Sequence, residues 1–211
     1  MSDLTLFVDA NYESPWAVAA FVALEEKQLP YTLVTKVLSK KETFEPGFAA
    51  RTNRIPALKH GDFWLAESTA ITEYLAEVFP FPKHPRLFPE DLQKRAICRE
   101  VMHWLRTDLM PLRAERPTTT FWCERAKKPL SAEAQAAAKR LVDYATALLQ
   151  HGRPTLFDAW CIADVDLAIA LQRLVINGDP VPEVVAKYVK ANWERPAMVK
   201  WNAFKRNATP L

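Results

Sequence analysis

The chain has 211 residues, of which 49% are hydrophobic and 25% are charged, a balance that excludes a disordered or fibrous protein. Its net charge of +3 is unevenly divided, because residues 1–80 carry seven Lys/Arg and eleven Asp/Glu, whereas residues 81–211 carry 21 and 14. The basic residues of the second part are scattered without a dense run, so we expect no nucleic-acid partner.

The N-terminal residues contain no basic leader followed by an apolar run, and no segment is long and apolar enough to span a bilayer. We therefore expect a cytoplasmic protein with no membrane partner. The three cysteines, Cys98, Cys123 and Cys161, are widely spaced and form no Cys-x-x-Cys pair. This spacing predicts reduced thiols and no metal site.

The chain begins with the pattern of a βαβ unit. Residues 4–8 are typical of a buried strand, and apolar residues then recur at helical spacing up to about Lys27. Residues 31–37 are rich in β-branched and aromatic side chains, as expected of a second strand. A unit of this kind places its two strands parallel to each other.

After an irregular segment, the pattern of a ββα unit follows. Apolar residues at 55–58 and 63–65 flank a Gly-containing turn at 60–62, which predicts a hairpin. Apolar spacing from 71 to 78 predicts the next helix. Residues 1–80 are thus expected to form one domain with the order βαβ-ββα.

Four prolines between residues 80 and 89 exclude a helix there and favour an extended connection. We therefore place a proline-rich linker at 81–90. Beyond it the pattern is almost wholly helical, so residues 91–211 are expected to form an all-helical domain. The apolar faces that predict its helices lie within residues 97–105, 141–149, 165–175, 185–189 and 197–204.

A first candidate functional residue is Ser14, which with Pro15 precedes the first helix. Ser14 can cap the helix, and proline suits the first helical position. A serine here serves a helix in many proteins without any further role. The alternative is functional, because the positive helix end and a hydroxyl donor would both stabilise a thiolate. Asn11, in the same loop, is a second candidate thiol contact, although loop asparagines usually serve turns.

Two further segments precede regular elements in the first domain. Arg54-Ile55-Pro56 leads into a predicted strand, which is also how an edge strand can start. Glu67 and Ser68 stand just before a predicted helix, where a serine can again be only a cap. The helix start offers N–H groups to a carboxylate, and Glu67 offers an acceptor to an ammonium group.

The domain order and these three segments, taken together, resemble the glutathione transferases. The resemblance implies an α/β, thioredoxin-like N-terminal domain and an all-α C-terminal domain. It also implies that Ser14 holds the glutathione thiolate, that Ile55 before a cis Pro56 pairs with the cysteinyl part, and that Glu67 and Ser68 bind the γ-glutamyl end. Arg54 is then either a solvated charge or a contact of the glycine carboxylate.

Differences from other family members are also informative. Phe7 and Val8 occupy the place where tyrosine-type members carry their tyrosine, and no cysteine occurs before Cys98. The resemblance therefore implies a serine-type transferase. The Ser-Pro-aromatic start and the stretch from Trp104 to Pro117 look most like the bacterial YfcF-type serine transferases, with Trp104, Arg106 and Arg113 as candidates for the electrophile site.

Within the second domain, the segment from Trp160 to Leu167 resembles the family's Ser/Thr-x-x-Asp capping box. Cys161 replaces the hydroxyl residue, but Asp164 can still accept from a backbone N–H. This motif concerns folding.

The function implied by the resemblance is activation of glutathione, the co-substrate, for attack on an electrophile, a peroxide or a disulfide, with a role in detoxification and a homodimeric assembly. Two alternatives stay open: a non-enzymatic binding or scaffold protein of the same fold, and a glutathione-dependent isomerase. The identity of the second substrate does not follow from the sequence.

Overall fold

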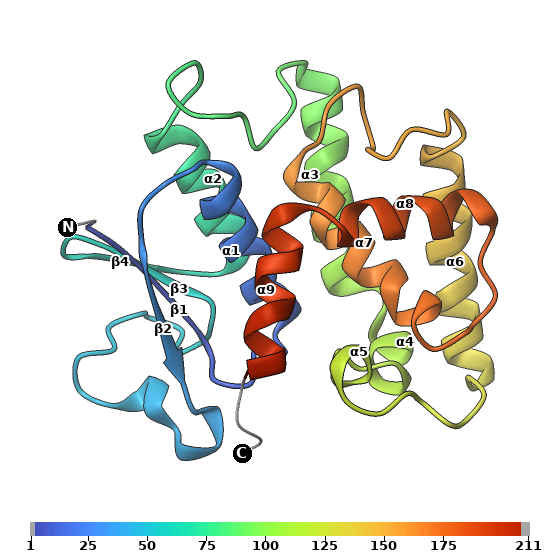
Figure 1. Cartoon of the computed structure of the whole chain (residues 1–211), viewed down its shortest axis with the longest axis horizontal. Coiled ribbons are helices and arrows are strands. Elements are labelled where there is room, and N and C mark those ends of the chain that lie inside the picture. The colour runs from blue at the N-terminus through green and yellow to red at the C-terminus, as the bar shows by residue number, and fades with distance from the viewer. Residues whose placement is uncertain (1–2, 208–211) are drawn as a thin grey trace. The chain divides into compact units, whose positions relative to one another are not determined.

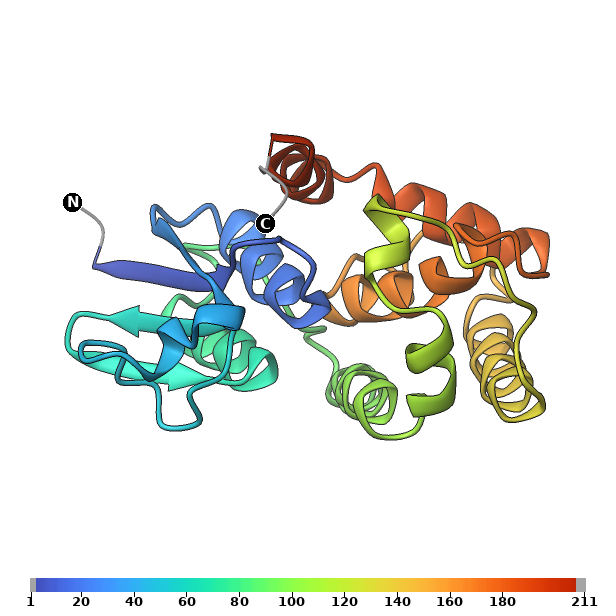
Figure 2. The same ribbon diagram turned by 90° about the horizontal axis from the view of Figure 1, so that it is seen from below.

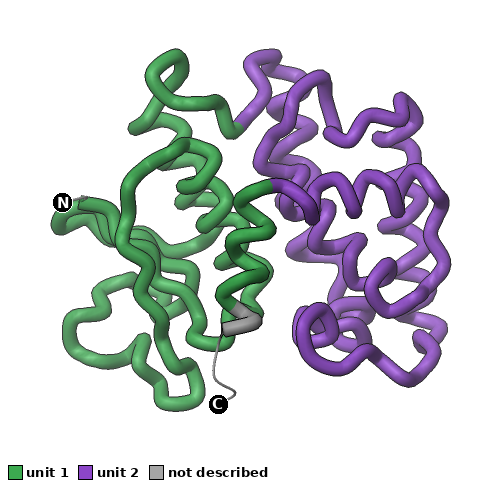
Figure 3. Tube along the Cα trace, in the orientation of Figure 1, with its two compact units in different colours: residues 1–87, 196–211 green, residues 88–195 purple. Residues whose placement is uncertain are grey.

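The computed structural model describes residues 3–207, with side chains up to Phe204. Two compact units make up the chain (Figure 3). Unit 1 contains the residues up to Leu87 together with those from Pro196 onward, and unit 2 extends from Phe88 to Arg195. The proposed division at a linker of residues 81–90 stays a prediction.

Unit 1 is built on a mixed four-stranded sheet in the order β2-β1-β3-β4 (Figure 1). β1 runs parallel to β2, as predicted, and antiparallel to β3, which forms a hairpin with β4. Gly61, in the turn of that hairpin, has a φ of 58°, a conformation that glycine adopts without steric cost. The strands are β1 (Leu4–Asp9), β2 (Thr32–Lys36), β3 (Ala57–His60) and β4 (Phe63–Ala66).

Two helices of unit 1, α1 (Pro15–Glu26) and α2 (Ser68–Val78), pack against each other and against the sheet. α1 lacks a polar face, and every residue from Ala17 to Leu24 is buried. Its C-terminal cap, Lys27, is almost fully buried and donates to the carbonyl of Phe79 at 2.5 Å, just after α2. The last carbonyls of a helix have no N–H partner within that helix, so this bond satisfies the end of α2 and joins it to the end of α1.

The last helix, α9 (Pro196–Asn207), also belongs to unit 1, where it packs against α1 (Figure 2). Trp201 is fully buried, and its ring centroid lies 5.1 Å from that of Phe21 and 5.6 Å from that of Tyr12. Phe204 extends the same aromatic cluster. Through these rings α9 contributes to the core of unit 1.

The regular secondary structure of unit 2 consists of helices, as predicted. α7 is buried along almost its whole length. Asp164 near its start accepts the N–H of Cys161 at 2.8 Å, which confirms that this carboxylate reaches back to the helix cap. The helices of unit 2 are α3 (Leu92–Thr107), α4 (Met110–Glu115), α5 (Thr119–Trp122), α6 (Ala132–Leu148), α7 (Ile162–Val175) and α8 (Glu183–Trp193).

Candidate functional site

Three segments carrying candidate residues leave the unit 1 sheet at the same edge. β1 ends at Asp9, β3 begins at Ala57, which pairs with Phe7, and β4 ends at Ala66, which pairs with Ala57. Because β3 runs antiparallel to β1 and β4, its first residue lies beside the last residues of both strands. The loop after β1, the segment before β3 and the start of α2 therefore share this edge. The candidates at this edge are Asn11, Ser14, Arg54, Ile55, Pro56, Glu67 and Ser68.

Ser14 is the N-cap of α1, with Pro15 in the first helical position. Its Oγ accepts the N–H of Ala17 at 3.3 Å. Among the described residues, whose side chains extend to Phe204, no protein group accepts the hydroxyl proton of Ser14. The hydroxyl thus caps the helix as an acceptor and keeps its donor for a ligand, at the end of α1 that favours negative charge.

Asp9, at the end of β1, holds the backbone that presents Ser14. Its Oδ2 accepts the N–H of Glu13 at 2.7 Å and its Oδ1 accepts the N–H of Ser14 at 3.2 Å, although only 6% of the residue is exposed. Burial raises the pKa of the Asp9 carboxyl above 3.8, and the two N–H bonds oppose that rise. Our sequence interpretation missed Asp9. The only available signal was the tendency of Asp to bond nearby backbone N–H groups.

The same loop is held from its other side by α9. Tyr12 has a φ of 54°, in the left-handed region, and its carbonyl accepts the indole N–H of Trp201 at 3.2 Å. Burial, and then the charge of Asp9, raises the pKa of the Tyr12 phenol above 10.0. Asn11 precedes Tyr12 and is half-buried in this loop. Its role as a thiol contact stays a prediction.

Glu67 and Ser68 join β4 to α2. Glu67 has a φ of 71° and a ψ of 117°, a backbone conformation that costs a non-glycine residue on the order of 1–3 kcal/mol. Glu67 is the N-cap of α2 without a side-chain capping bond, so Ser68 is not the cap but the first helical residue. Ser68 is buried, whereas Glu67 is exposed at the surface of the edge.

The segment before β3 contains a cis peptide bond between Ile55 and Pro56. Pro56 is buried, Ile55 is half-buried and Arg54 is exposed. Beside this segment, Phe7 stacks on Trp64 with a centroid distance of 4.9 Å, and both rings contact Phe48. Aromatic packing therefore supports the strand ends from which the candidate residues extend.

The three candidates on the second part of the chain all lie in unit 2, where they have partners. Arg106 donates to the buried Asp166 at 2.7 Å, and Arg113 donates to the carbonyl of Arg106 at 3.0 Å. The Trp104 ring lies 4.8 Å from that of Tyr144. These contacts bind the candidates into the helix packing, and an additional role at an electrophile site stays a prediction.

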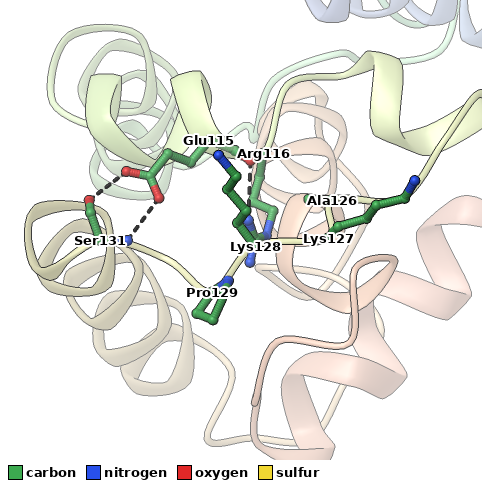
Figure 4. A pocket seen from close by; sticks show the side chains of 7 residues that line it. All are labelled: Glu115, Arg116, Ala126, Lys127, Lys128, Pro129 and Ser131. Carbon is green, nitrogen blue, oxygen red and sulfur yellow. Dashed lines mark hydrogen bonds between the residues drawn. The ribbon is translucent and has the colours of Figure 1, made fainter.

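Unit 2 also has a surface pocket of about 480 Å³ between α4 and the segment before α6 (Figure 4). Glu115 accepts the backbone N–H of Ser131 at 2.8 Å and its hydroxyl at 2.5 Å, and these bonds lower the pKa of Glu115. Arg116 forms two bonds to Asp179, at 2.7 and 2.9 Å. Glu115 and Arg116 therefore already bind protein groups and stabilise the packing around the pocket, so we assign no ligand to it.

Among the described residues, no group of three or more His, Cys, Asp or Glu side chains is placed to hold a metal ion. None of the described helices combines the length and apolar character required to cross a membrane.

Comparison with known families gives two matches. Residues 13–78 match the family described as glutathione S-transferase, N-terminal domain, and residues 91–206 match glutathione S-transferase, C-terminal domain. Among curated proteins, mouse (Mus musculus) glutathione S-transferase theta-3 is 38% identical over 93 residues. That alignment covers 43% of this chain and only 38% of the mouse protein.

Two solved structures are similar over nearly the whole chain. A glutathione transferase homologue from Burkholderia, with bound glutathione, is 40% identical, with a TM-score of 0.83, and the alignment covers 97% of this chain and 99% of that one. The Tau class glutathione S-transferase of mango (Mangifera indica) is 20% identical, with a TM-score of 0.73 and coverage of 97% and 96%. The second likeness concerns the fold alone.

Proposed function

This chain belongs to the glutathione S-transferase family, and from that premise we propose that it is an enzyme that activates the thiol of glutathione with Ser14. The proposal rests above all on the Ser14 hydroxyl, which accepts from Ala17 and has no acceptor for its own proton in the part of the chain whose side chains the structure describes. A thiolate at the start of α1 would provide that acceptor. The bound glutathione of the Burkholderia homologue supports the choice of ligand.

Ser14 would act by stabilising the charged form of the thiol. A thiol with an ordinary pKa of about 8.5 is only a few per cent ionised at neutral pH, and lowering that pKa by two units corresponds to about 2.7 kcal/mol. One hydroxyl donor and the positive end of α1 are suited to supply this stabilisation. The thiol proton leaves to solvent, and the sulfur electron pair attacks the second substrate.

The rest of the sheet edge would hold the tripeptide. Glu67 accepts from the α-ammonium group of glutathione, and Ser68 with the first N–H groups of α2 binds its α-carboxylate. Ile55, before the cis bond to Pro56, pairs through its backbone with the cysteinyl residue. We assign Arg54 to the glycine carboxylate and Asn11 to a second contact with the thiol. The strained backbone of Glu67 supports a positioned side chain at that place.

The second substrate would be an electrophile, a peroxide or a disulfide. In conjugation the sulfur forms a bond to the electrophilic atom, and the leaving group departs with its electron pair. Trp104, Arg106 and Arg113 of unit 2 are our candidates for the electrophile side. Since Arg106 and Arg113 are held by partners within the unit, they would contribute from fixed positions.

We further propose that the chain acts in the cytoplasm as a homodimer, that its domains divide at a linker of residues 81–90, and that it belongs to the YfcF-type serine transferases. The Ser14-Pro15 start and the stretch from Trp104 to Pro117 support the last assignment.

The test separates capping from catalysis by comparing two capping serines. Ser131 caps α6 through its Oγ at 3.2 Å from the N–H of Ala134, nearly the geometry of Ser14. We expect Ser14→Ala and Ser131→Ala each to lower the free energy of unfolding by about 1 kcal/mol. Only Ser14→Ala should lower turnover, by roughly 10- to 100-fold near neutral pH, because the thiol pKa rises by one to two units.

The decisive measurement is the ultraviolet absorbance of the glutathione thiolate, titrated against pH in the wild type and in both variants. Rising pH should partly rescue Ser14→Ala, because deprotonation by solvent replaces the missing donor. Coincident titration curves for the wild type and Ser14→Ala would remove Ser14 from the mechanism. Binding of glutathione without turnover on aryl halides, cumene hydroperoxide or a small disulfide would instead indicate a binding protein.

A further inference from the structure

The loop that carries Ser14 is held by backbone bonds and by one buried side chain. Between β1 and α1 the backbone makes a bond from the Ala10 N–H to the Lys36 carbonyl and one from the Tyr12 N–H to the Asp9 carbonyl. Neither bond fixes the residues next to Ser14. The N–H groups of Glu13 and Ser14 bond instead to the two carboxylate oxygens of Asp9, at 2.7 and 3.2 Å.

The N–H of an N-cap residue has no partner within its own helix, so its direction must be fixed from outside. In this chain the buried side chain of Asp9 fixes the direction of the Ser14 N–H and of the neighbouring Glu13 N–H. The Asp9 carboxylate is planar and is held at the end of β1, so it fixes the first turn of α1 relative to the sheet. The Ser14 Oγ is then set by the backbone and by the Ala17 N–H.

We propose that Asp9 is a positioning residue that acts through Ser14, holding its hydroxyl where the glutathione thiolate binds. The proposal rests on the function proposed for Ser14 and adds a residue that contacts neither substrate nor thiol. Asp9 is suited to this task because only 6% of it is exposed, so solvent does not compete for its two N–H partners.

The charge of Asp9 and its positioning of Ser14 would have opposite effects on the thiol pKa. A charged carboxylate that accepts the N–H of Ser14 repels a nearby thiolate, and this repulsion alone would raise the thiol pKa. Among the described residues, the charged or titratable neighbours of Asp9 include Glu13 and Tyr12 in the loop and Lys36, its pairing partner on β2, which forms a 3.7 Å ion pair with Glu45. Replacing the Asp9 carboxylate with a neutral side chain therefore changes the thiol pKa in opposite directions through the two effects, and the sign of the net change shows which one is larger.

The experiment titrates the thiolate absorbance of bound glutathione in Asp9→Asn, Ser14→Ala and the double variant. Asparagine keeps one acceptor but turns an NH₂ donor toward a backbone N–H, which displaces Glu13 or Ser14. If Asp9 positions Ser14, we expect Asp9→Asn to raise the thiol pKa by about half to one unit and to lower kcat/KM by roughly three- to tenfold at neutral pH. The double variant should show a thiol pKa no higher than that of Ser14→Ala alone, because Asp9 then has no hydroxyl left to position.

The matched control is Asp164→Asn in unit 2. Asp164 is also a buried carboxylate with two backbone N–H partners, Leu156 at 2.7 Å and Cys161 at 2.8 Å. This variant should lose stability without a change in the thiol pKa. If Asp9→Asn does not fold, Asp9→Glu retains the charge while moving the oxygens, and it should also raise the thiol pKa.

A lowered or unchanged thiol pKa in Asp9→Asn, or effects that add in the double variant, would overturn the role of Asp9 while leaving Ser14 in place. An unchanged thiol pKa in Ser14→Ala would overturn the proposed function itself. The two failures therefore appear in different variants.

Discussion

Ser14 and Ser131 take the same place in their helices but differ in what receives their hydroxyl proton. Both accept the N–H three residues along, and Ser131 also donates to Glu115 at 2.5 Å. Among the described residues Ser14 has no such acceptor. Capping therefore does not distinguish a functional serine from a structural one, whereas the partner of the hydroxyl proton does.

A prediction at the same scale concerns how Glu67 and Arg54 hold glutathione. We expect Glu67→Gln to weaken glutathione binding about tenfold, because the variant leaves the covered ammonium group of the ligand without its charged partner. Arg54→Gln should weaken binding less than threefold, since its ion pair would be solvated and Arg54, unlike the equally exposed Glu67, is not held by a strained backbone conformation. Calorimetric titration of both glutamine variants gives the two dissociation constants, and the reverse order would contradict our assignment of the γ-glutamyl end.

Single residues were predicted from the sequence where a local pattern marked them, as with Ser14 before Pro15. Asp9 lacked such a pattern, because its two bonds depend on how the loop folds back on the strand end. The strained backbone of Glu67 could not be predicted from the sequence either, since a glutamate does not indicate a positive φ.

Elements were predicted well where periodicity extended over several turns. The pattern identified α1, α2 and the long helices of unit 2, but it missed α4, α5 and the short 3₁₀ turns at Leu38–Lys40 and Glu42–Phe44. These pieces have three to six residues, too few for a hydrophobic period to appear. The pattern also gave α9 an apolar face without revealing that this face packs on α1.

At the scale of elements, the ion pair between α3 and α7 should be sensitive to pH. Asp166 is buried, and burial raises its pKa even though Arg106 opposes that rise. We expect Arg106→Met to lower the free energy of unfolding by about 3 kcal/mol at pH 8, because it leaves a buried carboxylate unpaired. The loss should shrink as pH falls, because the variant raises the folded-state pKa further and protonation then removes the unpaired charge.

The matched control is Arg140→Met, whose ion pair with Asp108 at 3.2 Å is exposed and should contribute less than about 1 kcal/mol. Urea unfolding of both variants between pH 4 and 8 measures the difference. An equal loss at every pH would show that Arg106 stabilises the helices only through packing.

For the whole molecule we predict a homodimer, and the exposed apolar residues offer a way to test it. Leu92, at the start of α3, is 75% exposed and Ile97 on the same helix is 36% exposed, so this helix offers apolar surface for a partner to cover. Sedimentation at micromolar concentration should give a species of twice the 24.1 kDa chain mass. Leu92→Lys should weaken that association at least tenfold, because a buried charge without a partner is costly.

Val199→Lys is the control, because Val199 is also exposed but lies on α9, far along the chain from the helices that flank the linker. It should leave the dimer intact. A single species of monomer mass for the wild type would contradict the dimer, and equal effects of both lysine variants would remove Leu92 from the interface.

The position of α9 also determines when unit 1 can be completed during protein synthesis. Because α9 belongs to unit 1 and follows unit 2 in the chain, the ribosome produces the whole of unit 2 before the Trp201 ring can cover α1. Until then the carbonyl of Tyr12 lacks the indole donor of Trp201, and the loop of Ser14 lacks this support. The loop proposed to bind the glutathione thiol thus reaches its described packing only after the helices of unit 2 have been synthesised.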